Sequence, residues 1–202
     1  MPRGPLSADA RRAATVDAVI ALAARHDPGE ISTTAIAQHM GVTQGALFRH
    51  FPSKDAILEA VIARVAEQLL ARLDAATLQA SGHGAALQAM FLAHTDFVAE
   101  HPGVPRLLFG ELQRSGATAP KRAAAMLLGQ YAERLRQRLE AGRALHEFDA
   151  DLDVEAAATL FIGSVQGLVM QALIAGDVQR IRRLAPRVFA IYRRGIEAGA
   201  RP

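Results

Sequence analysis

Residues 32–58 contain two short helical patterns separated by a glycine turn, and this segment constrains the fold more than any other. Thr33 can cap the first helix, and Gly41 can adopt the left-handed conformation that ends it. Thr43 can cap the second helix, which places Leu47 on the inner face of that helix. A tight turn between two such helices is typical of a helix-turn-helix. We therefore predict a helix-turn-helix whose second helix has a polar outer face.

The remaining sequence also reads as helix. Apolar residues recur at three-and-four spacing in each long segment, as on one face of an amphipathic helix. Glycine and proline residues interrupt this pattern between the segments, and no alternating run of apolar and polar residues predicts a strand. We therefore expect an all-α fold with about nine helices.

Composition narrows the class of protein. The chain has 202 residues, no cysteine and a formal net charge of +3. Without cysteine there are no disulfides and no thiolate chemistry, which fits a reducing compartment. The first residues, MPRGPLSADARR, lack the apolar stretch of a signal peptide, and no apolar run is expected to span a membrane. We expect a cytoplasmic protein with no membrane partner. The charge permits nucleic-acid binding but does not predict it.

Residues 33–61, TTAIAQHMGVTQGALFRHFPSKDAILEAV, resemble the signature of the TetR family of one-component transcriptional regulators. The rest of the chain is similar to that family in helical architecture only. The resemblance implies a three-helix DNA-binding domain over residues 1–52 and a helical effector-binding and dimerisation domain over residues 53–202. It also implies a homodimer that binds a palindromic operator in double-stranded DNA and responds to a small-molecule effector.

The outer face of the second helix supplies the candidates for contact with DNA. Gln44 lies where recognition helices reach base edges, and glutamine can pair with adenine through two hydrogen bonds. Thr43 is either a cap or a DNA contact, and Gly45 either allows close backbone approach or is a tolerated surface glycine. With the phosphate contacts that the resemblance implies, the DNA-binding candidates are Thr33, Thr34, Thr43, Gln44, Gly45, Phe48, Arg49, His50 and Lys54.

Basic residues near this segment have more than one interpretation. A lysine at the start of a helix opposes the helix macrodipole, so a phosphate partner would explain Lys54. Arg49 either contacts guanine or phosphate or remains solvated. Arg3, Arg11 and Arg12 form a basic N-terminal arm that either reaches the DNA or remains a solvated surface.

Phe48 departs from the family pattern, which commonly has tyrosine at this position. A tyrosine hydroxyl there is implied to bind phosphate. Phenylalanine is expected to keep the packing of the ring but to lose that hydrogen bond.

The last two helices are candidates for the dimer interface. Gly163 and Gly167 have a GxxxG spacing that allows two helices to approach closely. In the family that the sequence resembles, the two terminal helices pair with their copies as a four-helix bundle. The alternative is that this apolar surface is core within one chain. The dimer candidates are Gly163, Gly167, Met170, Val188, Ile191 and Tyr192.

An effector would need a cavity among the helices of the second domain. Apolar side chains there are either ligand contacts or ordinary packing, whereas a few polar groups among them would orient a ligand. The effector-binding candidates are Phe91, His94, Phe109, Met126, Tyr131, Phe161 and Gln166.

Other functional classes receive less support. His94 and His101 lie two turns apart without the closed ligand set of a zinc site, so no metal or cofactor is expected. No nucleophile–base pair or phosphate loop is found, so no enzyme activity is expected. We expect a ligand-responsive repressor that releases its operator on binding a small apolar or amphipathic molecule. A chromosome-organising DNA-binding protein without an effector, and an enzyme in the helical domain, stay open as alternatives.

Overall fold

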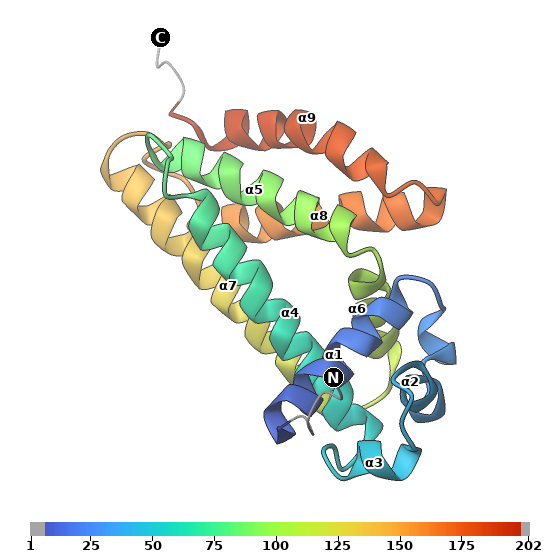
Figure 1. Ribbon diagram of the computed structural model, residues 1–202. Coiled ribbons are helices and arrows are strands. Elements are labelled where there is room, and N and C mark those ends of the chain that lie inside the picture. Colours follow the sequence, from blue (N-terminus) through green and yellow to red (C-terminus); the bar gives the residue numbers. More distant parts are fainter. Residues whose placement is uncertain (1–6, 199–202) are drawn as a thin grey trace. The chain divides into compact units, whose positions relative to one another are not determined.

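The prediction of an all-α fold is confirmed in the computed structural model, which describes residues 7–198. Within this range the chain forms nine α-helices and one short 3-10 helix (Figure 1). The helices are α1 (Ala8–Ala23), η1 (Pro28–Glu30), α2 (Thr33–His39), α3 (Gln44–Phe48), α4 (Lys54–Ala76), α5 (His83–Glu100), α6 (Gly103–Gln113), α7 (Ala119–Ala144), α8 (Val154–Ala175) and α9 (Gln179–Ile196).

Packing divides the described residues into two compact units. The first unit takes the described part of Met1–Glu67 together with His101–Leu127, and the second takes Gln68–Glu100 together with the described part of Leu128–Pro202. Helices α4 and α7 therefore contribute residues to both units. The predicted boundary between residues 52 and 53 separates two functions, whereas the compact units are defined by packing alone. It therefore stays a prediction.

Four short polar side chains begin helices in the first unit. The side chains of Ser7, Ser32, Thr43 and Ser53 accept hydrogen bonds from backbone N–H groups at the starts of α1, α2, α3 and α4. The cap of α2 is therefore Ser32 rather than the predicted Thr33. The Ser32 hydroxyl lies 3.0 Å from the backbone nitrogen of Ala35 and satisfies a donor that the helix itself cannot pair.

The turn between α2 and α3 has the predicted geometry. Gly41 has a φ of 65°, in the left-handed region where glycine carries no steric penalty. Val42 then donates its backbone N–H to the carbonyl of Ala37 at 3.0 Å, which closes the end of α2. Leu47 on α3 is buried together with Ile36 and Ala37 on α2. These contacts fix the two helices of the helix-turn-helix against each other.

Helix α6 packs closely against the end of α1 in the first unit (Figure 1). A Cβ atom added at Gly103 would lie 2.2 Å from the backbone carbonyl carbon of Ala23. Only a residue without a side chain fits at this helix contact. A Cβ at Gly110 would lie 3.3 Å from Pro28, so the same face of α6 also touches η1.

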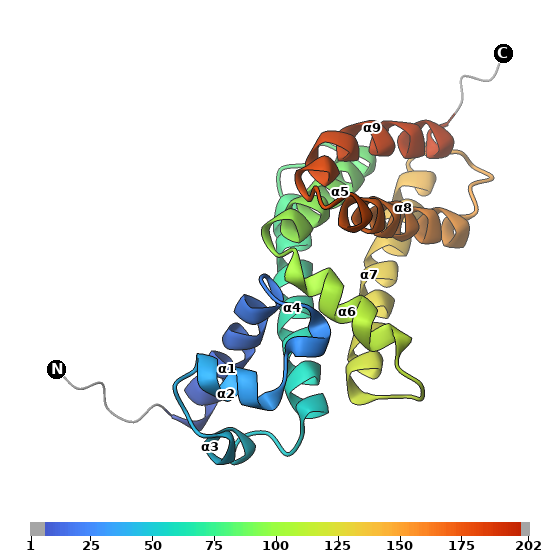
Figure 2. The same ribbon diagram turned by 90° about the vertical axis from the view of Figure 1, so that its right-hand side faces the viewer.

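Helices α5, α8 and α9 form the centre of the second unit (Figure 2). Their buried rings meet edge to face: the centroids of Phe91 and Phe161 are 5.2 Å apart, and those of Phe161 and Tyr192 are 5.4 Å apart. Such aromatic pairs add to the stabilisation from apolar burial. Phe189 packs against Phe91 in the same cluster, at 5.5 Å.

Helix α8 corrects the expectation about apolar runs. Val154–Ala175 is long and apolar enough to cross a membrane, by length and composition alone, and is the one such helix among the described residues. Packing within the protein also accounts for these apolar residues, because one side of α8 packs on α5 and α9 and buries Phe161, Val165 and Val169.

Candidate functional site

The outer face of α3 is an exposed surface, as the sequence predicts. Thr43, Gln44, Gly45, Phe48 and Arg49 are all exposed, whereas Leu47 on the opposite side of the helix is buried. The Thr43 hydroxyl accepts from the backbone N–H of Ala46 at 3.2 Å, so this residue is the N-cap. The cap does not bury the residue, and a DNA contact from Thr43 stays a prediction.

Gly45 has no neighbour that would require a glycine. A Cβ added there meets no atom within 4 Å, and its φ is not in the left-handed region. Glycine in a helix costs about 1 kcal/mol relative to alanine. Packing among the described residues therefore gives no reason for this residue, and both interpretations, close approach to DNA and a tolerated surface glycine, stay open.

Gln44 and Thr33 are joined by a side-chain hydrogen bond. The Gln44 Nε2 donates to the Thr33 hydroxyl oxygen at 2.6 Å, across the turn from α3 to α2. Gln44 is exposed and Thr33 is half-buried. Gln44, the predicted base-reading residue, is thus held by Thr33, another DNA-binding candidate. Thr34, the next residue in the chain, is exposed.

The predicted phosphate-contacting residues lie at the junction of α3 and α4. His50 and Lys54 are both half-buried, and Lys54 is the first residue of α4, directly after its cap Ser53. Arg12 on α1 donates to the backbone carbonyl of His50, and its guanidinium stacks 4.3 Å from the ring centroid of Phe51. Arg12 therefore contacts the end of α3 while its side chain remains exposed.

The other two residues of the predicted basic arm give less information. Arg11 is half-buried at the start of α1. Arg3 lies outside the described residues.

Phe48 is partly covered and partly exposed, and the expected ring packing stays a prediction. Its side chain is 42% exposed, one turn after Gln44 on the outer face of α3. The inner position at this end of the helix is taken by Leu47, which is 2% exposed. The Phe48 ring is therefore available to an outside partner but carries no hydrogen-bonding group.

Four effector candidates meet inside the second unit. Phe91, Tyr131 and Phe161 are buried, and the His94 Nδ1 lies within hydrogen-bond distance of the Tyr131 hydroxyl, at 3.3 Å. Burial lowers the pKa of His94 to about 4, so its imidazole is neutral at pH 7. Burial raises the pKa of Tyr131, so its hydroxyl stays protonated. The cluster thus offers two neutral polar groups among aromatic rings.

The other three effector candidates are not among the residues of this buried cluster. Gln166 is on the exposed side of α8. Phe109 and Met126 belong to the first compact unit, where Phe109 is half-buried and Met126 is 65% exposed. A role in effector binding stays a prediction for all three.

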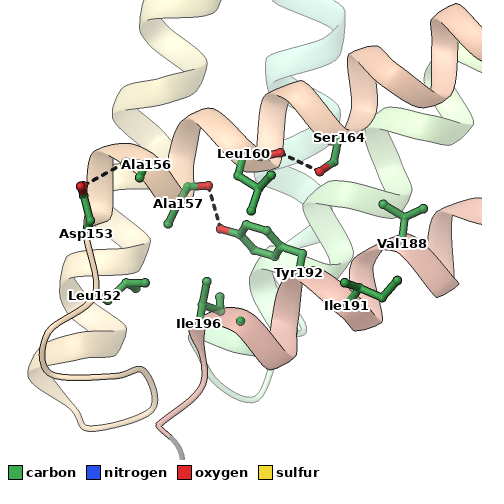
Figure 3. Close-up of a pocket in the computed structure, with 11 residues that line it drawn as sticks. Leu152, Asp153, Ala156, Ala157, Leu160, Ser164, Val188, Ile191, Tyr192 and Ile196 are labelled. Atoms are coloured by element: carbon green, nitrogen blue, oxygen red, sulfur yellow. Dashed lines mark hydrogen bonds between the residues drawn. The ribbon is translucent and has the colours of Figure 1, made fainter.

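Helices α8 and α9 expose an apolar face with a groove. The groove has a volume of about 470 Å³, and Leu160, Val188 and Ile191 line it (Figure 3). Leu160 and Ile191 are 57% and 64% exposed. A Cβ at Gly163 or Gly167 would meet no atom within 4 Å, so neither glycine is needed for packing within the chain. Met170, a further dimer candidate, is also exposed on α8.

Tyr192 differs from the other dimer candidates. Its ring is buried, and its hydroxyl donates to the backbone carbonyl of Ala157 at 3.1 Å, which joins α9 to α8 (Figure 3). Burial raises the pKa of Tyr192, so the donor proton is retained. The residue forms the floor of the groove and helps to hold the two helices that line it.

Comparison with known proteins identifies the family. The family model described as "Bacterial regulatory proteins, tetR family" matches residues 16–61. A second model, described as "Tetracyclin repressor-like, C-terminal domain", matches residues 115–188. The chain belongs to the TetR family.

The first curated relatives match only part of the chain. Over 80 residues the chain is 34% identical to the nucleoid occlusion factor SlmA of Haemophilus ducreyi (strain 35000HP / ATCC 700724), a match that covers 40% of each chain. The chain thus spans about two fifths of the length of the first curated relatives that it matches.

Two solved structures share the whole TetR fold. The regulator FadR from Bacillus subtilis, in complex with stearoyl-CoA, has a TM-score of 0.81 at 19% identity, covering 92% of this chain and 99% of that one. SmeT, the repressor of the Stenotrophomonas maltophilia multidrug efflux pump SmeDEF, has a TM-score of 0.76 at 18% identity, covering 96% and 93%. At this identity the likeness concerns the fold alone.

Sequence reasoning missed several residues of this TetR chain that now have a structural role. Leu160 and Ile174 extend the exposed apolar face of α8, and Ile174 is 80% exposed. The signal was present, because the long apolar run of α8 exceeds what one buried face requires. The sequence places Arg12 in a basic N-terminal arm, and nothing local in the sequence indicates its stacking on Phe51. Among residues 7–198, no group of three or more His, Asp or Glu side chains could hold a metal ion.

Proposed function

We propose that this protein is a DNA-binding transcriptional regulator that acts in the cytoplasm as a homodimer. The observation that carries the proposal is the exposed, capped α3, whose outer face holds Gln44 and Arg49 while Leu47 anchors the inner face. A recognition helix reads DNA with its N-terminal residues in the major groove, and Gln44 is the first residue of α3.

A homodimer gives each recognition helix a partner. The open glycines of α8 and the exposed Leu160 and Ile191 form a surface that a second copy of the chain can cover. Two-fold symmetry then places two recognition helices on a palindrome, with half-sites roughly 34–36 Å apart. Exposed apolar side chains on a helix pair are the kind of surface that such an interface buries.

We infer that an effector bound in the second unit would be a small apolar or amphipathic molecule. Phe91 and Phe161 supply an apolar environment, and the neutral His94 and Tyr131 supply hydrogen bonds that would orient one polar group. Few polar groups within a mostly apolar lining are typical of small-molecule sites. The stearoyl-CoA in the FadR complex is a molecule of this amphipathic class, bound by a protein of the same fold.

Helix α4 provides the route for regulation. It is one continuous helix that begins at Lys54, beside the α3 reading face, and its last residues belong to the second compact unit. An effector that changes the packing around the end of α4 would act on its start and alter the spacing of the two recognition helices. The size of the switch is set by the difference in effector affinity between the two states. In this mechanism the protein is a repressor that releases its operator.

Selection from a random pool of DNA duplexes tests the proposal. Full-length protein should recover a palindrome whose half-site centres are about one helical turn apart. Recovery of a palindrome that ceases to bind when a fatty acid or acyl-CoA is added would support the repressor mechanism. Failure to recover any preferred sequence would contradict the proposal.

One alternative has a specific observation in its favour. The first curated relatives are named nucleoid occlusion factors, although the matched part covers only about two fifths of their length. A chromosome-organising protein would bind many sites along the genome and show no shift in thermal stability with a panel of small molecules. Genome-wide mapping of bound sites separates the two functions, because a dedicated repressor occupies few promoters.

A further inference from the structure

The hydrogen bond between Gln44 and Thr33 is not needed to cap either helix. Ser32 caps α2 and Thr43 caps α3, so the Thr33 hydroxyl satisfies neither helix start. That hydroxyl instead accepts from the Gln44 Nε2 at 2.6 Å. Two residues eleven positions apart in the sequence are thereby joined on the exposed side of the helix-turn-helix.

A glutamine amide can donate to Thr33 and still pair with adenine. A primary amide has two N–H hydrogens and one carbonyl oxygen. Pairing with adenine uses Oε1, which accepts from N6, and the N–H on the same side as Oε1, which donates to N7. A bond from the other N–H to Thr33 therefore does not compete with adenine. The same amide can satisfy both partners at once.

The bond also restricts a side chain that is otherwise mobile. An exposed glutamine loses rotamer entropy when it is ordered, and binding normally includes that loss. With Nε2 held by Thr33, part of the ordering is already present before any partner arrives. A preorganised reading group discriminates between bases more strongly than one that can turn to suit each base.

We propose that Thr33 is a positioning residue for base recognition and that it holds the Gln44 amide in the orientation that reads adenine. The inference rests on the proposed function. Its partner is duplex DNA with an adenine under Gln44 in each half-site, and Thr33 acts on the choice of base through Gln44.

The experiment uses the full-length protein and the palindrome recovered from the random pool. Equilibrium affinities are measured for the palindrome, for each single base-pair substitution in a half-site and for replacement of each adenine by 7-deazaadenine, which lacks N7. Gln44→Ala identifies the base pair that Gln44 reads, because preference should be lost there alone. Thr33→Val removes the hydroxyl and keeps the shape, and Thr33→Ser keeps the hydroxyl.

Thr33→Val is expected to reduce the preference for adenine at that base pair by about fivefold to tenfold and to leave the preferences at other positions unchanged. Thr33→Ser should retain the preference. Adding Thr33→Val to Gln44→Ala should reduce it no further, because the two residues act through one contact. Thermal unfolding of each variant verifies that the fold is intact.

Three results would overturn the inference. A Thr33→Val protein that loses affinity for every sequence alike would make Thr33 a phosphate contact instead. A Thr33→Val protein with unchanged base preference would show that Gln44 needs no support. A Gln44→Ala protein that retains all base preferences would remove the reading residue itself. If the wild-type protein selects no sequence at all, it is the proposed function that fails, which separates that failure from the other three.

Discussion

At the scale of single residues, the reading face divides into groups that hold α3 and groups that point outward. Leu47 is buried, and Arg12 stacks on Phe51 and bonds to the backbone of His50. Gln44, Phe48 and Arg49 are exposed. Local sequence patterns predicted this division for Leu47, Gln44 and Arg49, because the inner and outer positions of a short helix follow from its period. They could not predict the Arg12 contact, which joins residues far apart in the chain.

Phe48 yields a prediction about affinity. Phe48→Tyr adds a hydroxyl at the end of an exposed ring, where the family commonly has tyrosine. One new hydrogen bond to a phosphate is worth about 0.5–1.5 kcal/mol, so operator affinity should rise about twofold to tenfold for all sequences alike. Fluorescence anisotropy with operator and unrelated duplexes measures this effect, and Phe48→Leu serves as the control. A rise confined to one sequence, or no rise at all, would contradict the prediction.

His94 yields a prediction about pH. Its pKa in the folded protein is lowered by burial to about 4, below the ordinary value of 6.5. The unfolded chain therefore binds the proton first as pH falls, so stability is complete above pH 6.5 and is lost towards pH 4. The loss at this residue amounts to about 3 kcal/mol.

Urea unfolding at pH 7, 5.5 and 4.5 measures the loss at His94. His94→Gln removes the titrating group, so the difference between wild type and variant isolates it from the carboxylates that titrate in the same range. Equal pH dependence in the two proteins would show that His94 is already solvated in the folded state.

At the scale of helices, glycines lie in two different environments, one tightly packed and one open. Gly103 at the start of α6 is in close contact with the end of α1, whereas Gly163 and Gly167 on α8 have open space beside them. Periodicity predicted the helices themselves, because their apolar spacing is local. The sequence could not separate a glycine required by packing within the chain from one left open on the surface, since that difference depends on which helices meet.

Gly103→Ala should destabilise the first unit. Its Cβ would lie 2.2 Å from the backbone of Ala23, and neither backbone can yield as a flexible side chain would. Overpacking of this kind costs about 1–3 kcal/mol. Chemical denaturation measures the loss, with Gly129→Ala on α7 as the control, because a Cβ there meets nothing within 4 Å. Equal stability of the two variants would mean that α6 does not pack on α1 as described.

Gly163→Leu should weaken the dimer without harming the folded chain. Among the described residues, no atom of a neighbouring element lies within 4 Å of a Cβ at this position, so the monomer can accept a larger side chain. A second copy that packs against α8 cannot. Analytical ultracentrifugation should show a shift to monomer, while Gly129→Leu, at an equally open glycine of the second unit, should remain dimeric. A Gly163→Leu protein as dimeric as wild type would exclude this face of α8 as the interface.

At the scale of the whole molecule, the sequence predicted the class of fold and the helix-turn-helix because both depend on local patterns. It misjudged the cap of α2, since adjacent Ser32 and Thr33 can both act as caps and only the hydrogen bond to Ala35 decides between them. It also did not separate buried effector candidates such as Phe161 from exposed ones such as Met126 and Gln166. Apolar residues at helical spacing predict a helix, but they do not show which other helices pack against it.

The central claim is that α3 and the start of α4 bind DNA, with Gln44 reading a base and Lys54 contacting phosphate. Operator affinity of the Gln44→Ala/Lys54→Ala protein, measured across a series of salt concentrations beside both single variants, tests it most directly. Lys54→Ala should weaken all sequences alike and lower the salt slope by about one unit. Gln44→Ala should relax preference at one base pair, and the double variant should show both effects. A double variant that binds the operator as tightly as wild type, with the same salt slope, would contradict the account.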